Sequence, residues 1–456
     1  MSKKIKNSVN QHSRREFLKI GTAAGIGAAL SGFTGSGCSS QKLTSAPVVF
    51  TAKPIKNVRI GYVGVGGMGS AHVANLMRIE GCEIVALCDI VPAKVERWQK
   101  KFKDEGKPVP DGYTKGEYDF KRLCERDDID LVYTATPWIW HVPVCVEAMN
   151  TGKHAATEVP AAITIDECWQ LVETQDKTKK YAVMMENCCY DRFEMMTLNM
   201  VRNGLFGELL HGECGYLHDL RGVKFSNRGE GIWRYNHSVK RDANLYPTHG
   251  LGPVAQCMNI NRGDAFDYLV SMSTKQAGMG LFVKEHLPDD DPRKNLKYKL
   301  GDVNVSLIKT KKGKSITLYH DCSNPRPYSR KHVIQGTGGI AEKYPARVHV
   351  EGISEGHRWD EPDKWYEKYE HPLWKEIGKE NSQIGHGGMD YLEDYRLIKC
   401  LNNGEPLDLD VYDAAAWSAI VEMSEISVAN KSRPVDFPDF TRGTWKTRTP
   451  LGIVEP

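Results

Sequence analysis

Apolar and polar positions follow two different patterns along the chain, and the change near residue 188 divides it into two regions. In the first region, short apolar runs of strand length are separated by longer segments with helical spacing. Strands are predicted at 58–63, 83–87, 130–136, 153–157 and 181–186, helices at 92–105, 120–126, 142–151 and 166–179, and a loop at 108–118. Strands that alternate with helices predict a doubly wound, parallel-sheet domain over residues 56–188.

The second region, residues 189–430, has strand-like stretches in series with few helices between them. After a helix at 193–203, strands are predicted at 209–217, 268–274, 303–310, 315–321 and 332–335. This order favours an open-faced, mostly antiparallel sheet. Amphipathic helices at 390–401 and 411–430 could pack back on the first domain. Residues 431–456 are predicted to be a tail, exposed at 440–447.

A polar segment at 225–248 lies between the predicted strands of the second region. It is rich in Trp, Arg, Tyr, Asn and His, which is unusual for a simple connection. Long loops in compact domains are usually either functional or disordered, so both interpretations stay open.

Composition and charge exclude several functional classes. The 456 residues exceed one ordinary core, and the net charge of +3 comes from interspersed acids and bases, so nothing indicates a nucleic-acid partner. The twelve cysteines contain no C-x-x-C spacing. We therefore expect buried free thiols and neither a disulfide framework nor a metal site.

The first 40 residues have the pattern of a twin-arginine export signal. Arg14 and Arg15 precede a weakly apolar Gly/Ala-rich stretch, and at about 14 residues this stretch is shorter than the roughly 20 that span a membrane. Such a signal predicts transfer of the folded protein to the periplasm by the twin-arginine machinery; the alternative is a mobile basic tail. Cys38 could become a lipid-anchored first residue, or cleavage could occur nearby. Residues 41–55 would then be a flexible linker.

A glycine-rich turn follows the first predicted strand and carries the clearest chemical signal. Gly64, Gly66 and Gly69 form G-x-G-x-x-G between a strand and a helix, with Gly67 inside the motif. Such glycines allow a tight bend, a close approach of pyrophosphate and close helix packing. Asp89 ends the next strand, 20 residues after Gly69, where it can bind both ribose hydroxyls and repel a 2′-phosphate. The sequence predicts a Rossmann domain that binds NAD rather than NADP.

The turn that holds Trp138 and its neighbours follows the strand that ends near Thr136. This turn is predicted to lie beside the cofactor, because ligands bind beyond the carboxyl ends of parallel strands. Glu158 and Val159-Pro160 follow the next strand, and Asn187 follows the last strand of this region. Two alternatives stay open. His141 could cap the following helix, and Glu158 could only anchor a turn.

The order of the glycine turn, Asp89, T-x-T-P at 134–137 and E-x-P at 158–160 resembles the glucose-fructose oxidoreductase and inositol dehydrogenase (Gfo/Idh/MocA) family. The resemblance covers about residues 56–430. Within it, the motif GYVGVGGMGSAH, the turn after Pro137 and the run Tyr246-Pro247-Thr248-His249 resemble one branch, the NAD-dependent α-N-acetylgalactosaminidases of glycoside hydrolase family 109.

Two departures from the parent dehydrogenases separate this chain from them. Val159 stands where those enzymes carry the lysine of E-K-P, and Leu245 stands where an aspartate precedes the histidine by four residues. A net dehydrogenase that lacks both groups would need other proton-transfer residues.

The branch resemblance implies retaining hydrolysis of terminal α-N-acetylgalactosamine through transient oxidation at C3. Elimination of the C1 group, addition of water and return of the hydride follow, with no net redox change. It implies proton transfer by His249 and Tyr246. Substrate contacts are implied for Tyr216, Arg234, Tyr246, Pro247, Thr248, His249 and Tyr328. Cofactor contacts are expected for Gly64, Gly66, Gly67, Met68, Gly69, Asp89, Trp138, Ile139, Trp140, His141, Glu158, Val159, Asn187 and Tyr246.

Two other functions stay open at this point. One is a sugar dehydrogenase or other oxidoreductase with net redox turnover, and the other is a non-catalytic sugar-binding protein that retains NAD. The expected partner is in each case a small sugar or glycan. The sequence leaves open whether the chain forms a homo-oligomer.

Overall fold

The computed structural model describes residues 50–453. The predicted export signal at 1–40, the lipidation candidate Cys38 and most of the predicted linker at 41–55 therefore lie outside the described residues.

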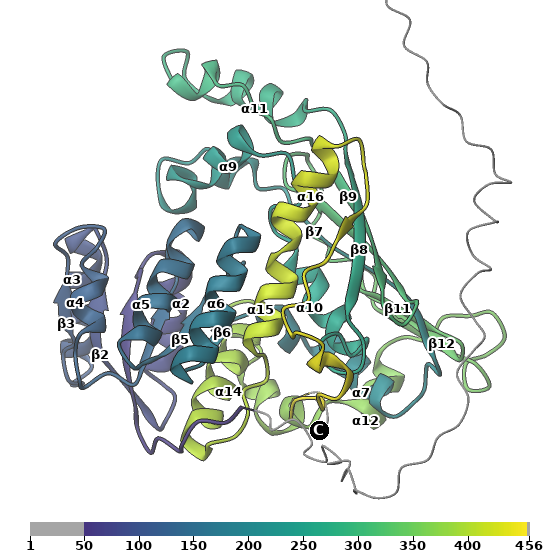
Figure 1. Ribbon diagram of the computed structural model, residues 1–456, viewed down its shortest axis with the longest axis horizontal. Helices are drawn as coiled ribbons and strands as arrows, with labels where there is room; N and C mark the ends of the chain where they lie inside the picture. The colour runs from purple at the N-terminus through teal and green to yellow at the C-terminus, as the bar shows by residue number, and fades with distance from the viewer. Residues whose placement is uncertain (1–49, 454–456) are drawn as a thin grey trace, which may run out of the picture. The chain divides into compact units, whose positions relative to one another are not determined.

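Six parallel strands form the first sheet, in the order β3-β2-β1-β4-β5-β6 (Figure 1). The strands are β1 (Val58–Val63), β2 (Cys82–Cys88), β3 (Asp111–Tyr113), β4 (Leu131–Thr134), β5 (His154–Thr157) and β6 (Ala182–Met184). The central strand β1 pairs with β2 on one side and β4 on the other, so the strand order reverses at the end of β1. This is the order of dinucleotide-binding sheets and confirms the doubly wound prediction.

Helices connect these strands, and their ends follow local chemistry. The elements are α2 (Gly67–Leu76), α3 (Pro92–Asp104), α4 (Phe120–Cys124), η1 (Trp138–Trp140), α5 (His141–Asn150), α6 (Ile165–Thr178) and η2 (Asn187–Tyr190). Helix α3 starts with Pro92, whose missing N–H costs nothing at this position. Helix α6 starts with a capping box in which Thr164 and Glu167 satisfy each other's backbone N–H groups.

The second sheet has eight strands in the order β13-β12-β11-β7-β10-β9-β8-β14. The strands are β7 (Leu209–Leu217), β8 (Phe266–Ser273), β9 (Asn304–Thr310), β10 (Ser315–Asp321), β11 (Val333–Gly336), β12 (Gly339–Glu342), β13 (Arg347–Val350) and β14 (Val435–Asp436). Only β7 and β10 pair in parallel within this sheet, and the other pairs are antiparallel. The prediction of a mostly antiparallel second sheet is confirmed.

The second region also contains helices, some of which pack on its sheet while others reach back to the first domain. They are α7 (Arg192–Arg202), α8 (Arg221–Lys224), η3 (Gly229–Ile232), α9 (Arg234–Lys240), α10 (Thr248–Cys257), α11 (Gly278–His286), η4 (Pro292–Asn295), α12 (Asp363–Tyr369), η5 (Trp374–Gly378), α13 (Lys379–Asn381), α14 (Met389–Asn403), α15 (Val411–Ser418), α16 (Ile420–Ala429) and η6 (Thr444–Lys446). Helix α10 lies against β7 and α16 against β8, whereas α14 packs on α2 and α15 on α6.

Several local predictions are wrong. The predicted loop 108–118 contains the edge strand β3. The single helix predicted at 411–430 is two helices that meet at Ala419. The predicted long loop at 225–248 folds into the short helices η3 and α9 before α10 begins.

Both ends of the described chain are held more firmly than predicted. Within the predicted linker, the N–H of Ile55 donates to the carbonyl of Leu401 at 2.9 Å and the N–H of Ala52 donates to the hydroxyl of Tyr181 at 3.0 Å. The predicted tail at 431–456 adds β14 to the second sheet. Phe440, predicted to be exposed, is 2% exposed and its ring centroid lies 4.8 Å from that of Trp169. Removing the apolar Phe440 ring from water stabilises the fold, which explains why this segment packs against the protein.

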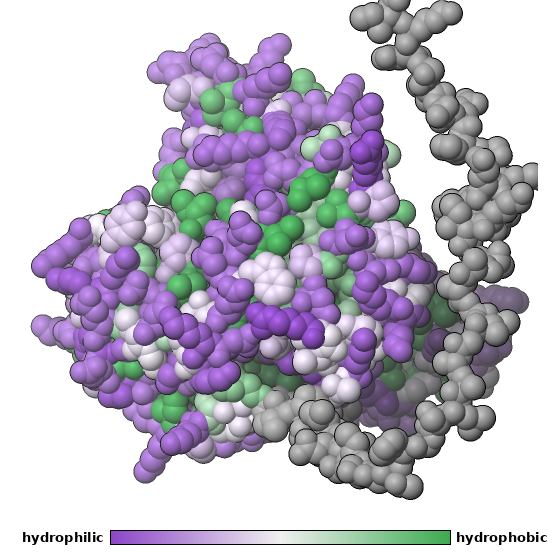
Figure 2. Space-filling model, in the orientation of Figure 1, coloured by the Kyte–Doolittle hydropathy of each residue, from purple (hydrophilic) through white to green (hydrophobic). Residues whose placement is uncertain are grey.

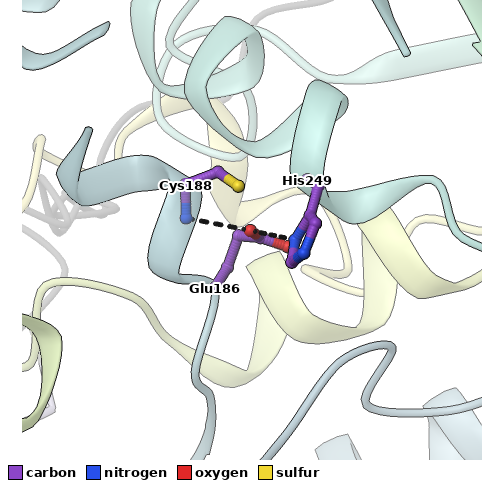
Figure 3. Close-up of side chains that lie close together, drawn as sticks. All are labelled: Glu186, Cys188 and His249. Carbon is purple, nitrogen blue, oxygen red and sulfur yellow. Dashed lines mark hydrogen bonds and ion pairs between the residues drawn. The ribbon is translucent and has the colours of Figure 1, made fainter. Parts of the chain in front are cut away.

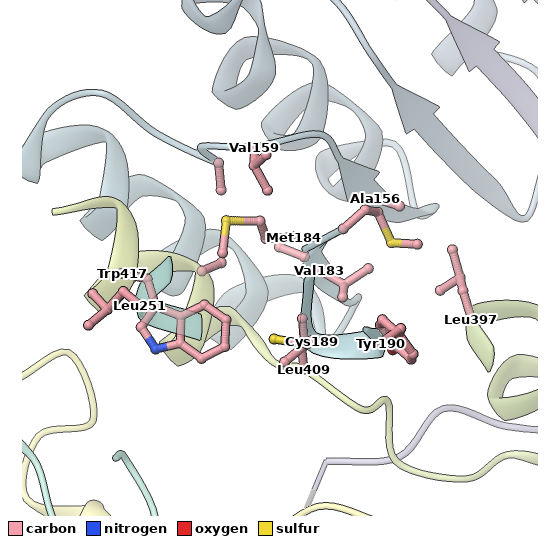
Figure 4. Close-up of a cluster of buried hydrophobic side chains, with 14 of the residues drawn as sticks. Ala156, Val159, Val183, Met184, Cys189, Tyr190, Leu251, Leu397, Leu409 and Trp417 are labelled. Carbon is pink, nitrogen blue, oxygen red and sulfur yellow. The ribbon is translucent and has the colours of Figure 1, made fainter. Parts of the chain in front are cut away.

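One continuous core joins the two sheets. Figure 4 shows buried side chains from β5, β6, α10, α14 and α15, among them Met184, Leu251, Leu397 and Trp417. Because helices of the second region fill the core behind the carboxyl ends of β5 and β6, residues from both regions are held rigidly beside those strand ends.

The surface and the thiols agree with the composition. Hydrophilic side chains cover most of the face seen in Figure 2, with apolar residues between them. Among residues 50–453, no helix combines the length and apolar character that a bilayer crossing requires. Every cysteine in this range is a free thiol and all but Cys82 are buried, as predicted.

Candidate functional site

The glycine turn between β1 and α2 has the geometry that a pyrophosphate requires. Gly64 has φ +88°, and a Cβ there would lie 2.8 Å from the carbonyl oxygen of Ala135. A Cβ on Gly69 would lie 1.9 Å from the carbonyl oxygen of Gly64, so α2 packs directly on the turn. Gly67, by contrast, has no atom within 4 Å of its Cβ position, and α2 carries no capping side chain and no acid in its first turn. The helix N-terminus is therefore open to an anion.

Asp89 ends β2 and faces this turn. Its Oδ2 accepts a hydrogen bond from the N–H of Val65 at 3.1 Å, and its Oδ1 accepts one from the N–H of Val91 at 2.9 Å. Lys94 Nζ lies 3.4 Å from both oxygens. The carboxylate is thus fixed at the end of β2, where the ribose of a dinucleotide lies in this fold.

Replacing Asp89 by asparagine is expected to reduce the preference for NADH over NADPH by about tenfold, or about 1.4 kcal/mol. The amide keeps one acceptor for the backbone N–H groups but removes the charge that repels a 2′-phosphate. Titrations of tryptophan fluorescence with each nucleotide measure the ratio. Asp104→Asn, which changes an exposed carboxylate on α3 paired with Lys100, is the matched control. An unchanged ratio in Asp89→Asn would contradict the assignment.

The four predicted residues after β4 divide into two groups. Trp138 is buried, and its ring centroid lies 5.7 Å from that of Tyr246 and 5.2 Å from that of Trp233. Ile139 is exposed, and Trp140 packs edge-on against Tyr118 and Phe120, on the first domain. Trp138 therefore connects the cofactor domain with the second region.

His141 is buried at the start of α5. Its Nδ1 lies 2.8 Å from the carbonyl oxygen of Pro160 and its Nε2 lies 2.8 Å from that of Thr136. Burial lowers the pKa of this imidazole. The side chain does not cap α5 but joins two strand-end turns, and both ring nitrogens already have partners. These contacts favour a structural role, and a direct contact with the cofactor stays a prediction.

Glu158 and Val159 form the turn after β5. Glu158 Oε1 lies 2.7 Å from Nε2 of His72, and its Oε2 accepts a hydrogen bond from the N–H of Val159 at 3.1 Å. His72, on α2, also lies 2.9 Å from Asp394 of α14. Burial alone would lower the pKa of His72, but these two carboxylates raise it well above its ordinary value. Val159 is 2% exposed and faces the core in Figure 4, so it offers no proton-transfer group.

Asn187 follows β6 and is also tied to α14. Its Nδ2 donates to Oδ1 of Asp390 at 2.6 Å, and the Asp390 carboxylate lies 2.8 Å from Nδ1 of His386. Burial alone would raise the pKa of Asp390, but these partners hold it at about 2. Met68 lies on the first turn of α2, beside the open helix end. The predicted cofactor residues of the first domain therefore follow the carboxyl ends of β1, β2, β4, β5 and β6, which are consecutive neighbours in the sheet.

The predicted substrate residues of the second region form an aromatic cluster with His249. The ring centroid of Tyr216, on β7, lies 4.6 Å from that of Tyr246, 5.3 Å from His249 and 6.2 Å from Tyr328. The ring centroids of Tyr246 and His249 are 4.8 Å apart and nearly perpendicular. These four residues, which come from β7, from the start of α10 and from position 328, thus share one wall. Burial raises the pKa of Tyr246 well above its ordinary value, so its hydroxyl stays protonated.

Arg234, at the start of α9, lies over this cluster. Its guanidinium carbon is 4.7 Å from the ring centroid of Tyr246 and 5.1 Å from that of Trp138. It forms an ion pair with Glu230, one turn earlier. Burial alone would lower the pKa of Arg234, but Glu230 keeps it above its ordinary value, so the cation is retained in a largely apolar setting. Pro247 and Thr248 are buried at the helix start.

Two residues of this wall escaped prediction from the sequence. His218 Nδ1 lies 3.1 Å from the Tyr216 hydroxyl, and the His218 ring centroid lies 4.9 Å from that of Tyr328. Glu186, between β6 and η2, lies 2.7 Å from Nδ1 of His249 (Figure 3). His218 directly follows the predicted strand 209–217, and this position is a sequence signal for a site residue. Glu186 also ends a predicted strand, but nothing local in the sequence indicates its partner.

Glu186, Cys188 and His249 are the one group in residues 50–453 that brings three metal-type ligand atoms together, within 4.8 Å of one another. Hydrogen bonds already use these atoms. Nδ1 of His249 pairs with Glu186, and the thiol of Cys188 donates to Oδ1 of Asn187 at 3.4 Å. Burial raises the pKa of the Cys188 thiol well above its ordinary value, and the thiolate is the form that binds metals. The group is better described as a hydrogen-bonded cluster than as a metal centre.

Comparisons with known proteins identify a related family for each of the two regions of the chain. The chain matches the family model described as "Glycosyl hydrolase 109, C-terminal domain" over residues 190–447 and that described as "Oxidoreductase family, NAD-binding Rossmann fold" over residues 58–186. A protein named glycosyl hydrolase family 109 protein from Solibacter usitatus is 50% identical over 447 residues, which cover 97% of this chain and 100% of that one. One from Shewanella pealeana is 49% identical over 451 residues, covering 97% and 99%.

A solved structure shows the same fold at much lower identity. The inositol dehydrogenase homolog from Azotobacter vinelandii, complexed with NAD+, superimposes with a TM-score of 0.63 and 18% identity, covering 85% of this chain and 99% of that chain. Because the parallel domain matches the NAD-binding Rossmann family model, NAD is its cofactor. The turn at Gly64–Gly69 and the fixed carboxylate of Asp89 fit that cofactor.

Proposed function

Because this chain belongs to glycosyl hydrolase family 109, we propose that it hydrolyses terminal α-linked N-acetylgalactosamine with retention and without net redox change. The observation that carries this proposal is the aromatic wall of Tyr216, Tyr246 and His249 beside the carboxyl ends of the cofactor-binding strands. Aromatic faces bind the apolar faces of sugar rings, and a histidine there can exchange protons near neutral pH.

The bound NAD supplies a reversible hydride acceptor for C3 of the sugar, so the chain's own residues need only bind, orient and move protons. His249 Nε2 makes no hydrogen bond within residues 50–453, and the side chain keeps 13% of its surface exposed. It is the group that takes a proton from the sugar and returns it. Tyr246, whose raised pKa keeps the hydroxyl protonated, donates a hydrogen bond rather than acting as a base.

Binding of the remaining sugar groups falls to residues at the edge of the wall. Arg234 offers a charged donor for a hydroxyl or for the acetamido carbonyl. Tyr328, 37% exposed with its hydroxyl accepting from Arg330 Nη1 at 3.0 Å, limits the site toward solvent. Pro247 and Thr248 fix the start of α10, which orients Tyr246 and His249 together.

A sugar dehydrogenase with net turnover is the second candidate, because the solved relative with NAD+ is an inositol dehydrogenase homolog. The buried Val159 argues against it. That side chain occupies the turn where the dehydrogenases of the parent family are expected to carry a proton-transferring lysine, and it packs into the core instead.

One assay separates these functions. Purified protein is incubated with p-nitrophenyl α-N-acetylgalactosaminide without added NAD, while nitrophenol release and absorbance at 340 nm are followed together. Sustained nitrophenol release without accumulation of NADH supports the hydrolase, and early appearance of the α-anomer by proton NMR supports retention. NADH formed in proportion to free sugar would support the dehydrogenase and overturn the proposal. If neither nitrophenol nor NADH is formed while NAD stays bound, the result would favour a non-catalytic sugar-binding protein.

We also propose that residues 1–40 direct export by the twin-arginine route. This route moves folded proteins, so NAD would be acquired before export. An enzyme that restores its own NAD in each turnover needs no external recycling of NADH after export, which makes the two proposals mutually consistent.

A further inference from the structure

Glu186 is a buried carboxylate that none of the preceding roles uses. It lies between β6 and η2, and its side chain is 0% exposed. Its Oε1 lies 2.7 Å from Nδ1 of His249 and accepts a hydrogen bond from the N–H of Cys188 at 3.1 Å. Figure 3 shows the carboxylate aimed at the edge of the His249 imidazole.

The ionisation of Glu186 depends on that imidazole. Burial alone would raise the pKa of Glu186, but the neighbouring His249 ring and its hydrogen bond hold the pKa below the ordinary value. Its second oxygen, Oε2, makes no hydrogen bond in the described part of the chain. Near neutral pH the group is therefore an ionised carboxylate whose main side-chain partner is His249.

An ionised carboxylate can only accept hydrogen bonds, and this determines the tautomer of His249. Nδ1 must carry a hydrogen, so the lone pair of the neutral ring is on Nε2. Close packing fixes the carboxylate in turn, because a Cβ on Gly252 of α10 would lie 3.1 Å from Cγ of Glu186 and 3.0 Å from Sγ of Cys189. The Glu186 side chain therefore packs directly against the backbone of α10, the helix that carries His249.

We propose that Glu186 is a positioning residue that fixes the orientation and tautomer of His249 for proton transfer to and from the sugar. The proposal rests on the function proposed above. When Nε2 of His249 takes a proton from the substrate, the imidazolium stays paired with the Glu186 carboxylate, which itself stays ionised. The same proton leaves from Nε2 in the return step, so no proton moves to Glu186.

The test compares Glu186→Gln with the wild type in the nitrophenol assay. The amide can either accept from or donate to Nδ1, so it keeps the shape of the site but no longer selects one tautomer. We expect kcat to fall by roughly 100-fold or more with KM changed by less than about threefold, because the missing effect acts in the transition state. The NADH affinity measured by fluorescence should stay unchanged.

The pH profile distinguishes a positioning role of Glu186 from a merely structural one, because the loss of a structural contact would leave the profile unchanged. Removing the buried anion disfavours the imidazolium, so the acid-side fall of kcat/KM should shift to lower pH in Glu186→Gln. The matched control is Glu370→Gln. Glu370 is also buried, directly after α12, and its carboxylate accepts a hydrogen bond from Nε of Arg192 at 2.9 Å. Its profile and kcat should match those of the wild type.

A second measurement does not depend on activity. In a histidine-selective 15N long-range spectrum, with His249→Ala to identify the signal, His249 of the wild type should show a protonated Nδ1 and a bare Nε2 at pH 8. Glu186→Gln should shift this signal toward a tautomer mixture. A wild-type kcat and pH profile in Glu186→Gln, or an unchanged spectrum, would overturn the proposal. A wild-type protein that shows the expected spectrum but releases no nitrophenol would instead refute the proposed function.

Discussion

Replacement of His249 by alanine is expected to lower kcat by roughly 1,000-fold while the protein still binds NADH. General acid–base catalysis by a positioned side chain contributes about 100- to 10,000-fold, and no other histidine has its ring in direct contact with both Tyr216 and Tyr246 within residues 50–453. The loss is measured with p-nitrophenyl α-N-acetylgalactosaminide, and NADH binding by fluorescence titration. The cofactor site should be largely unaffected, because all of its predicted contacts except Tyr246 belong to the first domain.

The same substitution leaves Glu186 buried without its imidazole partner. Removing one partner of a buried pair costs about 3–5 kcal/mol when the other charge is retained. The folded-state pKa of Glu186 lies below its ordinary value of 4.5, so the pair stabilises the wild type above about pH 4.5 and this contribution is lost as the pH falls further. The stability deficit of His249→Ala should therefore be largest near neutral pH and should shrink in acid. Urea unfolding at pH 7 and pH 4 measures this difference.

His249→Gln separates the loss of catalysis from the loss of stability. Its amide can still donate to Glu186, so the unfolding midpoint should recover, whereas kcat should stay as low as in His249→Ala because an amide does not exchange protons. Added imidazole should restore part of the activity of the alanine variant only. Full activity in either variant would show that proton transfer does not use His249.

The cofactor half of the fold could be predicted from the sequence because its signals are local. A buried strand, three glycines at fixed spacing, a helix and Asp89 follow one another within 32 residues, and each has one structural meaning. The edge strands β3 and β14 could not be predicted, because two or three residues with polar neighbours carry no periodicity. The break at Ala419 was equally hidden, since neither Gly nor Pro marks it and apolar residues continue on both sides.

The candidate site could be predicted only in part because its members come together through tertiary packing. Tyr216 and Tyr246 were proposed from their motifs, but the contact between their rings depends on β7 lying beside α10. Glu186 meets His249 across 63 residues of sequence, and a lone glutamate at a strand end has no signal for that partner. For His141, the motif is visible in the sequence but its contacts are not. Its ring lies against the carbonyl oxygens of Thr136 and Pro160, in two turns whose proximity the sequence alone does not indicate.

Residues near the C-terminal end of the sequence, on helix α14, also help to position the site through tertiary packing. Asp394 holds His72 behind the glycine turn, and Asp390 holds Asn187 at the end of β6. Two cofactor-side elements thus take their positions from a helix that begins at residue 389. Helix α14 therefore supports two elements of the predicted NAD site, although none of its own residues is a predicted cofactor contact.

Replacement of Gly69 by alanine is expected to abolish useful cofactor binding, with the NADH affinity reduced on the order of 100-fold. The added Cβ would lie 1.9 Å from the carbonyl oxygen of Gly64 and 3.2 Å from the ring of Tyr62. Neither can give way easily. Gly64 is already at φ +88° against the backbone of Ala135, and Tyr62 is fully buried. Helix α2 must therefore move away from β1, which displaces the N–H groups that face the pyrophosphate.

This overpacking should also cost at least about 2 kcal/mol of stability and lower the thermal midpoint by several degrees. Gly222→Ala is the matched control, because Gly222 also lies near the start of a helix but has no atom within 4 Å of its Cβ position. Its midpoint and NADH affinity should equal those of the wild type. If Gly69→Ala kept both values as well, the close contact between α2 and the glycine turn would not be what holds the cofactor site in shape.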